Sequence, residues 1–370
     1  MKTTPATLLT LLLLASCANI EVDDFSFEIQ DTKMTSSIRG LDVLNKSCVW
    51  ISGAEGQYCF TTDEGSTWTK GTVPGASSLD FRDVEAFSEQ SALLMSAGPG
   101  ENSRIYRTDN GGNSWELCYQ NKDSLGFFDA MDFLDDEEGI LFSDPVDAKI
   151  NLLRTSDGGR TWARLDPSVL PEMKTDEYAF AASGTSIMYD WQGGIWVVTG
   201  GSTARIWHAF SIEGPWEIFT PPSISGDPAA GLFSIDVLSD LHKAAVGGNY
   251  REMNLTGSNV VTWDDESYGW VVPENSGNLP FMECVKWLSA NALLATGPPG
   301  VYFSNDKGDS WEGIYEGAFH TLDVDVKGNT GWLAGSQVQL LALRRSACNS
   351  GTRPGRKAAD HRGGVGWSRR

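Results

Sequence analysis

The chain has 370 residues, of which 41% are hydrophobic and 21% are charged, so it has enough apolar side chains for a core and is not wholly disordered. Its net charge of −21 argues against nucleic acid as the partner, because phosphate binding needs a basic surface. The 40 Gly and 14 Trp favour short strands and tight turns over helices.

Residues 1–17 are predicted to be a lipoprotein signal peptide. An apolar stretch at 8–14, too short to span a bilayer, follows Lys2. It ends in the sequence LASC, which resembles the bacterial lipobox, a motif in which the cysteine is lipidated after cleavage. We expect Cys17 to anchor the protein to a bacterial membrane outside the cytoplasm, with the outer membrane favoured. An ordinary secretory signal with an incidental cysteine is the alternative.

Residues 18–35 are expected to form a tether followed by a strand. Residues 18–24 are polar and acidic, which suits a link between a lipid and a folded domain. The segment FSFEIQ at 25–30 alternates like a strand and precedes the first repeat. We expect this strand to complete the last repeat and so close a ring.

Cys48 and Cys59 flank a predicted hairpin turn at Gly53 and Ala54. If residue 52 pairs with residue 55, the two cysteines lie opposite each other, and a disulfide can form in an oxidising compartment. Two half-buried thiols are the alternative. The chain has no CxxC motif and only four His, so we expect no metal site and no bound cofactor.

Four segments share the pattern Ser/Thr-x-Asp/Asn-x-Gly-x-Ser/Thr-Trp, which is the Asp box, or BNR repeat, of β-propellers. In this turn the Asp or Asn accepts hydrogen bonds, the glycine takes a positive φ, and the tryptophan packs between repeats. One carboxylate per turn is too few to bind calcium, so the expected role is structural. The residues are Asp63, Gly65 and Trp68; Asn110, Gly112 and Trp115; Asp157, Gly159 and Trp162; and Asp306, Gly308 and Trp311.

The spacing of the tryptophans indicates the size of one repeat. The first three are 47 residues apart, and the 149 residues from Trp162 to Trp311 leave room for two degraded copies, which end at Trp216 and Trp270. A second pattern, an expected pair of inner strands, recurs seven times within residues 36–343. Each copy spans about 44 residues, the length of a four-stranded blade. The predicted fold is therefore all-β, a seven-bladed β-propeller with Asp-box repeats.

The first strand of each expected blade starts a recurring pattern with a small or aromatic pair. These segments are IRGLDV (38–43), FRDVEAF (81–87), FFDAMDF (127–133), FAASGT (180–185), LFSIDVL (232–238), FMECVKW (281–287) and FHTLDVDV (319–326). The seventh copy has three plausible strands and no Asp box, so it needs the strand at 25–30. Residues 344–370 differ from the rest, with eight basic and one acidic side chain against 20 basic and 48 acidic ones before them. We expect this tail to be disordered or frameshifted, or else a basic interaction tail.

The repeats and the run from FFDAMDF (127–133) to TSDGGRTW (155–162) resemble the photosystem II stability/assembly factor-like proteins. EYAFAASGTS (177–186), WVVTGG (196–201) and the segment 231–250 are also similar to bacterial members of that group. The resemblance covers about residues 25–343 and implies a seven-bladed Asp-box propeller. Photosynthetic members bind an immature subunit during assembly of a membrane complex. The resemblance therefore implies a protein-binding or assembly role.

One face of the predicted propeller is the candidate binding face, because the starts of the first strands and the turns between second and third strands meet there. If its four arginines converge, they can hold an acidic segment or a terminal carboxylate through bidentate hydrogen bonds. The alternative is that Asp83, Asp129, Asp144 and Glu283 neutralise them. The candidate residues are Arg39, Arg82, Asp83, Asp129, Asp144, Asp147, Arg205, Tyr250, Arg251, Glu283 and His320.

No enzymatic role is expected from the sequence. Sialidases share the Asp box, but the Tyr–Glu pair that their chemistry needs cannot be identified here. The sequence also shows no redox cofactor motif and no Ser-His-Asp pattern. We therefore expect a lipid-anchored, monomeric propeller that binds a protein, such as a subunit of a membrane complex. A carbohydrate-active propeller that binds or cleaves glycans is the alternative.

Overall fold

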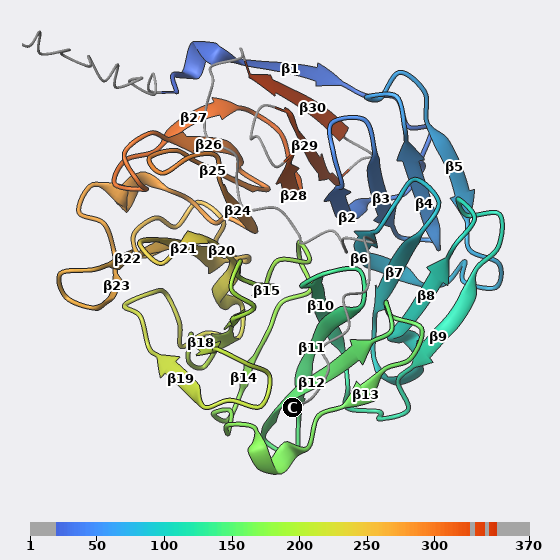
Figure 1. The fold of residues 1–370 in the computed structure, drawn as a ribbon. Coiled ribbons are helices and arrows are strands. Elements are labelled where there is room, and N and C mark those ends of the chain that lie inside the picture. Colours follow the sequence, from blue (N-terminus) through green and yellow to red (C-terminus); the bar gives the residue numbers. More distant parts are fainter. Residues whose placement is uncertain (1–19, 326–329, 337–339, 346–370) are drawn as a thin grey trace, which may run out of the picture.

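The computed structural model describes residues 20–325, 330–336 and 340–345, which contain thirty strands. These strands form seven sheets around a central axis, so the predicted all-β, seven-bladed propeller is confirmed (Figure 1). Cys17 and residues 346–370, the predicted anchor and tail, lie outside the described residues. Within the described ranges, no helix is long and apolar enough to cross a membrane.

Blades one to three are four-stranded sheets that run in chain order from the axis to the rim. Blade one consists of β2 (Ile38–Val43), β3 (Val49–Gly53), β4 (Gln57–Thr61) and β5 (Thr69–Thr72). Blade two consists of β6 (Asp80–Ala86), β7 (Ala92–Ala97), β8 (Arg104–Thr108) and β9 (Glu116–Gln120). Blade three consists of β10 (Phe128–Phe133), β11 (Glu138–Val146), β12 (Lys149–Ser156) and β13 (Ala163–Arg164).

Blades four to six follow the same plan with one addition. Blade four consists of β15 (Ile187–Tyr189), β16 (Ile195–Val198), β18 (Ile206–Ala209) and β19 (Trp216–Phe219). Blade five consists of β20 (Ala230–Ser239), β21 (His242–Asn249), β22 (Val260–Asp264) and β23 (Gly269–Val271), and the short strands β14 (Glu177–Tyr178) and β17 (Gly200–Gly201) extend its inner edge. Blade six consists of β24 (Cys284–Trp287), β25 (Leu293–Gly297), β26 (Gly300–Ser304) and β27 (Glu312–Tyr315).

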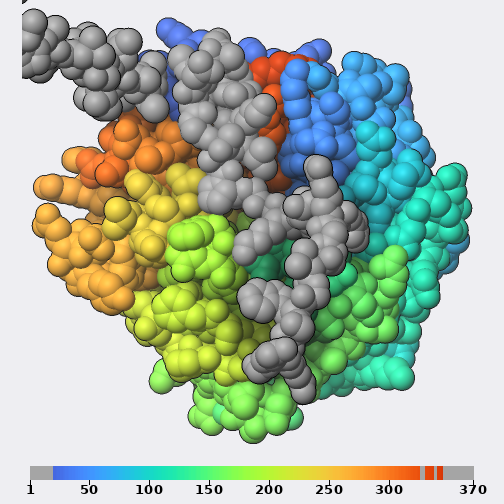
Figure 2. Space-filling model, viewed as in Figure 1, coloured from blue at the N-terminus to red at the C-terminus, as the bar shows by residue number. Residues whose placement is uncertain are grey.

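Blade seven joins the two ends of the ring. Its strands β28 (Phe319–Val324), β29 (Thr330–Gly335) and β30 (Leu340–Arg345) are completed by β1 (Phe25–Ile29), which pairs antiparallel with β30. The N-terminal and C-terminal strands therefore lie side by side, and the blades form a continuous ring (Figure 2). Because β30 extends to Arg345, residues 344 and 345 belong to the propeller rather than to the tail. Four short 3-10 helices complete the described structure: η1 (Val22–Asp24), η2 (Gly100–Asn102), η3 (Pro167–Val169) and η4 (Ser276–Asn278).

The core is divided into layers between neighbouring blades. The middle strands β3 and β4 are buried at every residue, whereas the outer strand β5 is mostly exposed. A strand that packs on both faces needs apolar side chains on both faces, which explains the continuous apolar runs in the middle of each blade. Trp50, which is fully buried, fills the layer between blades one and two together with Phe81.

The four Asp boxes form the turns between the third and fourth strands. In the first box the Asp63 carboxylate accepts hydrogen bonds from the backbone N–H of Thr67 at 2.8 Å and from the hydroxyls of Thr61 and Thr67 at 2.8 and 2.6 Å. The glycines at the equivalent turn position all have positive φ, from 78° to 89°. Trp68 packs edge-on against Trp332 of the preceding blade. These contacts account for the motif by turn formation and packing between blades.

The prediction of a disulfide between Cys48 and Cys59 is wrong. Cys59 pairs with Ile51 across the hairpin, so its side chain and that of Cys48 point to opposite faces of blade one. Cys48 is buried in the layer between blades one and two, and Cys59 in the layer between blades one and seven. Both are free thiols, and burial raises the pKa of Cys48 to about 11 and that of Cys59 to about 12. The turn is longer than expected, because Ser52 pairs with Tyr58.

Candidate functional site

The first strands of the seven blades lie nearest the axis of the ring (Figure 1), and we call the region that they enclose the channel. We call the end at which these strands begin the entry end, and the end at which they finish the exit end. Most of the predicted binding-face residues belong to the entry end. The two ends differ in how their charged side chains are arranged, so each is described separately.

At the entry end, a β-bulge interrupts the first strand in five blades. The extra residue is Arg39, Arg82, Asp129, Phe233 or His320. A bulge bends the strand and redirects the extra side chain, which here brings residues of different blades together. Arg39 interacts electrostatically with Arg82 and Glu283, and Asp129 interacts with Arg82. The structure therefore brings five of the predicted residues to one end of the channel: Arg39, Arg82, Asp129, Glu283 and His320.

Most charged groups of the entry end have partners within the fold. The Arg82 guanidinium donates to Asp80 at 2.8 Å and to the carbonyl of Ala181 at 3.0 Å. His320 Nδ1 lies 2.6 Å from Glu283 Oε2, and both side chains are buried. Two groups are exceptions. The Arg39 side chain makes no hydrogen bond or ion pair with any residue that the structure describes. Both carboxylate oxygens of Asp129 are buried without a hydrogen-bond partner among the described residues. Asp80, which sequence analysis did not single out, is therefore the direct partner of Arg82.

Asp129 and Asp144 are a pair of neighbouring acids near the entry end. Burial raises the pKa of Asp129 well above its usual range, and the charge of Asp144 raises it further. Burial raises the pKa of Asp144 to about 6. Both carboxyl groups therefore hold protons more strongly than exposed acids do.

The other predicted face residues do not join this cluster into one arginine site. Arg205 is buried, donates from Nε to Glu177 at 2.8 Å and stacks over Trp207. Arg251 lies over the ring of Tyr250, and Asp147 is exposed in the turn between β11 and β12. Because Arg82 and Arg205 are bound to Asp80 and Glu177, the expected four-arginine docking site is not formed.

A segment of blade four crosses the channel and separates its two ends. Residues 180–185, expected to form the first strand of that blade, form no strand, and β15 begins only at Ile187. Thr185 donates to Ser234, and Ser183 donates to the carbonyl of Glu283. A side chain could not fit at Gly184, where φ is 74° and a Cβ would lie 2.4 Å from Asp83.

Asp83 lies on the exit side of this crossing segment, so its place in the predicted face is wrong. It is the residue after the Arg82 bulge, and its carboxylate accepts from the backbone N–H of Met131 at 2.8 Å. Burial raises its pKa well above the usual range, and Asp132 and Asp42 raise it further. Asp83 lines a cavity instead of neutralising an arginine.

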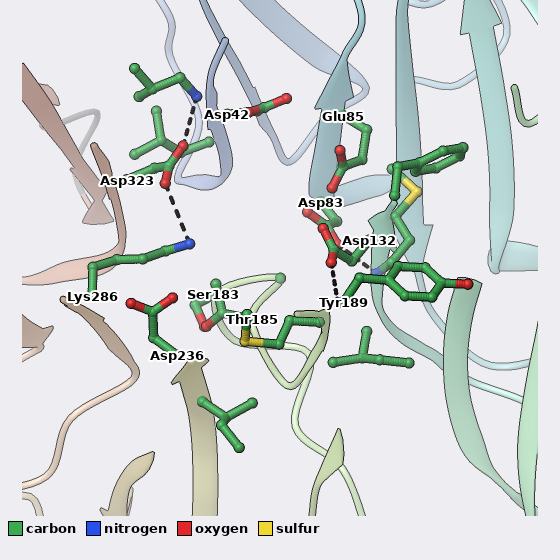
Figure 3. Close-up of a pocket in the computed structure, with 18 of the residues that line it drawn as sticks. Asp42, Asp83, Glu85, Asp132, Ser183, Thr185, Tyr189, Asp236, Lys286 and Asp323 are labelled. Atoms are coloured by element: carbon green, nitrogen blue, oxygen red, sulfur yellow. Dashed lines mark hydrogen bonds and ion pairs between the residues drawn. The ribbon is translucent and has the colours of Figure 1, made fainter. Parts of the chain in front are cut away.

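The exit end contains a cavity of about 270 Å³ whose walls come from the first strands of all seven blades. One strand position contributes a carboxylate in five blades, a methionine in blade four and a lysine in blade six. The five acids and the lysine, which Figure 3 labels, surround the open centre of the view. They are Asp42, Glu85, Asp132, Asp236 and Asp323, with Met188 and Lys286, and we call them the exit ring. Apolar side chains, including Leu44, Leu134 and Trp191, also line the cavity.

The carboxylates of the exit ring connect neighbouring blades. In four of them, one oxygen accepts a hydrogen bond from a backbone N–H of the next blade, at 2.5 to 2.8 Å. The pairs are Asp42 with Ala86, Asp132 with Tyr189, Asp236 with Trp287, and Asp323 with Val43. First strands of neighbouring blades do not share a ladder, so these bonds satisfy N–H groups of their inner edges.

The exit ring gathers acids around one cation. Lys286 Nζ lies 3.4 Å from Asp323 Oδ1, and it is the only basic side chain among the described residues that line the cavity. The pKa of Asp132 is raised to about 7, mainly by burial. The hydrogen bond from the Tyr189 N–H and the charge of Lys286 act in the opposite direction, and the charge of Asp42 adds to the increase. In the part of the chain that the structure describes, no group of three or more His, Cys, Asp or Glu side chains is placed to hold a metal ion. The carboxylates are spread around the channel, and this arrangement suits an extended organic cation better than a single metal ion.

Sequence analysis missed the exit ring, although a signal for it is present. The aligned first-strand segments carry an acid at the same place in LDV, VEA, MDF, IDV and LDV. The prediction concentrated on the start of each segment, where arginine and histidine are more conspicuous. An acid between two buried residues in five copies is unusual for a solvated face, and that recurrence could have identified the ring.

The chain matches no protein-family model, and comparison with curated protein sequences gives no match. Among solved structures, YCF48 bound to a D1 peptide is 16% identical with a TM-score of 0.62, covering 91% of this chain and 100% of that one. YCF48 from Cyanidioschyzon merolae is 16% identical with a TM-score of 0.61, covering 86% and 99%. The WD40 domain of Neurospora crassa Pan2 is 12% identical with a TM-score of 0.59, covering 86% and 91%. The resemblance to photosystem II assembly factor-like proteins is thus confirmed at the level of the fold, a seven-bladed β-propeller.

Proposed function

We propose that this protein is a binding scaffold, lipid-anchored through Cys17 outside the cytoplasm, whose protein partner places a positively charged side chain in the exit cavity. The single observation that carries the proposal is the exit ring, in which five carboxylates and one lysine face a cavity. The YCF48 structure with a D1 peptide shows that a propeller of this shape can take a peptide. The anchor rests on the sequence motif around Cys17.

The size and charge of the cavity support a side chain as the ligand. Small-molecule sites are usually about 300–1,000 Å³, and this cavity is smaller, at about 270 Å³. A lysine or arginine side chain brings an apolar stem and a cationic head, which match the leucines and tryptophan of the wall and the acids of the ring. An acidic partner is disfavoured at the exit end, because it would meet the carboxylates of the exit ring.

The test is capture of partners from detergent-solubilised membranes, with the full chain as bait. Asp42→Asn combined with Asp236→Asn removes two charges but keeps an oxygen that can accept the N–H of the next blade. We expect recovery of the specific partner to fall at least ~10-fold, which corresponds to about 1.4 kcal/mol. Glu266→Gln, an exposed acid on blade five, is the matched control and should capture as the wild type does.

A synthetic version of the captured segment then identifies the cation. Replacing each lysine or arginine of that peptide in turn should reveal one position whose loss weakens binding to the wild type but not to the doubly substituted protein. Equal capture by the wild type and the double variant would overturn the proposal. A partner whose binding depends on acidic residues would overturn it as well.

A further inference from the structure

The entry end holds a second arrangement that the binding role does not use. Ser336, just after β29, lies with its Oγ 2.9 Å from His320 Nε2. His320 Nδ1 in turn lies 2.6 Å from Glu283 Oε2. The three residues come from blades six and seven, and Ser336 and His320 lie at the same end of the antiparallel pair β28 and β29, where Phe319 pairs with Gly335.

This geometry is that of an activated serine nucleophile. A hydroxyl within hydrogen-bond reach of an imidazole, whose other nitrogen is held by a carboxylate, is the arrangement used for acyl transfer on several unrelated folds. Glu283 and His320 are buried, at 6% and 5% exposure, whereas Ser336 is half-buried. A buried base with a more open nucleophile is the distribution that such chemistry needs.

Arg39 is a half-buried arginine at the same end of the channel. Arg39 interacts electrostatically with Glu283, and it has no hydrogen-bond or ion-pair partner among the described residues. An arginine in that position can hold a carboxylate through two parallel hydrogen bonds. A substrate with a negative charge near its acyl group would match such an arginine.

We propose that Ser336, His320 and Glu283 form a catalytic triad that hydrolyses esters whose acyl part carries a carboxylate. His320 Nε2 removes the proton from Ser336 Oγ, the Oγ–carbon bond forms, and the ester carbon–oxygen bond breaks. His320 returns the proton to the departing alcohol. A water molecule, deprotonated by His320, then attacks the acyl-serine, which releases the acid and regenerates Ser336. Glu283 accepts the Nδ1 hydrogen bond throughout, which keeps Nε2 free to act as the base.

The first experiment is labelling of the full chain with a fluorophosphonate probe, followed by mass spectrometry of the labelled peptide. The expected result is one adduct on Ser336. Ser336→Ala should abolish it, and His320→Asn should slow it at least ~100-fold, because general-base catalysis contributes about 10²–10⁴. Ser124→Ala, which removes an exposed serine, should label as the wild type does.

The second experiment tests the substrate class by comparing 4-nitrophenyl hydrogen adipate with the neutral 4-nitrophenyl hexanoate. Arg39→Gln should lower kcat/KM for the charged ester about 10-fold or more and leave the neutral ester unchanged, since only the former loses a charged contact. Circular dichroism of each variant establishes that it is folded. If the folded wild type gives no adduct at Ser336, or if folded Ser336→Ala or His320→Asn hydrolyses both esters as fast as the wild type, the triad is refuted. Neither result depends on the exit cavity.

Discussion

The entry and exit ends of the channel are built from the same seven strands but handle charge in different ways. At the entry end, Arg82 lies next to the opposite charge of Asp80, and the buried Glu283 carboxylate lies 2.6 Å from His320 Nδ1. At the exit end, acids repeat around the ring and are held by backbone N–H groups of neighbouring blades. A backbone N–H stabilises a carboxylate without neutralising it. The exit end therefore keeps net negative charge inside a cavity, and the entry end largely does not.

The comparison shows that residues at one strand position can both connect neighbouring blades and supply charge to a cavity. One oxygen of each bonded exit-ring acid holds the next blade, and the carboxylate still contributes charge to the cavity. The bulges at the entry end have another effect, since they redirect side chains of different chemistry toward each other. Four measurements can separate these effects, starting with the largest expected change.

Removing the buried acid of the entry end should cost the most. Glu283→Ala leaves His320 without its carboxylate and removes one of the two negative charges, Glu283 and Asp80, that interact with Arg39. We expect the free energy of unfolding to fall by about 3–5 kcal/mol, because one partner of a buried pair loses its compensation. Urea denaturation measures the loss, with Glu316→Ala at an exposed position as the control. A loss under about 1 kcal/mol would show that the pair is not a stabilising contact.

The pH dependence of stability should report the charge kept at the exit end. The pKa of Asp132 is raised to about 7 in the fold, so the folded state binds its proton more tightly than the unfolded chain. The contribution of this acid to stability is therefore lost as pH rises toward 7, by up to about 1.4 kcal/mol per pH unit. Asp132→Asn should gain stability relative to the wild type as pH rises from about 4 to about 7, and the difference should stay constant at higher pH. Parallel curves for the two proteins would contradict the assignment.

The bond between blades can be separated from the charge at Asp323. Asp323→Ala removes the acceptor of the Val43 N–H and should cost about 1–3 kcal/mol, since a buried donor is left without a partner. Asp323→Asn keeps an oxygen there and should stay within about 1 kcal/mol of the wild type, because the pair with Lys286 is partly exposed. Thermal unfolding of both variants measures the difference. Equal losses would mean that charge, not the N–H bond, is what matters.

The smallest effect is expected from Arg82→Gln at the entry end. Its ion pair with Asp80 leaves both side chains about 30% exposed, so solvent screens the attraction. The loss should stay below about 1 kcal/mol, and added salt should reduce it further. Melting curves at low and high salt provide the test. If Arg82→Gln lowers the free energy of unfolding as much as Glu283→Ala does, exposed and buried pairs at this end do not differ in their contribution to stability.

Local sequence patterns account for most of the fold. The Asp-box turns need only residues within eight positions of each other, as the bonds of Asp63 to Thr61 and Thr67 show. Alternation in residues 25–30 predicts a strand, and β1 occupies that segment. The same local reasoning failed at residues 180–185, because their small side chains are explained by contacts with Asp83 and Ser234, which lie far away in sequence.

The sequence by itself determined the repeat, the number of blades and the approximate place of the first strand in six of the seven blades, because hydrophobic period and turn chemistry act over a few residues. Only the tertiary structure decided the partners of the charged groups. The Arg205 side chain could not be known to face Glu177, nor Ser336 to face His320, until the blades were placed in space. The exit ring shows the same division: its acids recur visibly in the sequence, but the ring closure of seven blades is what brings them around one cavity.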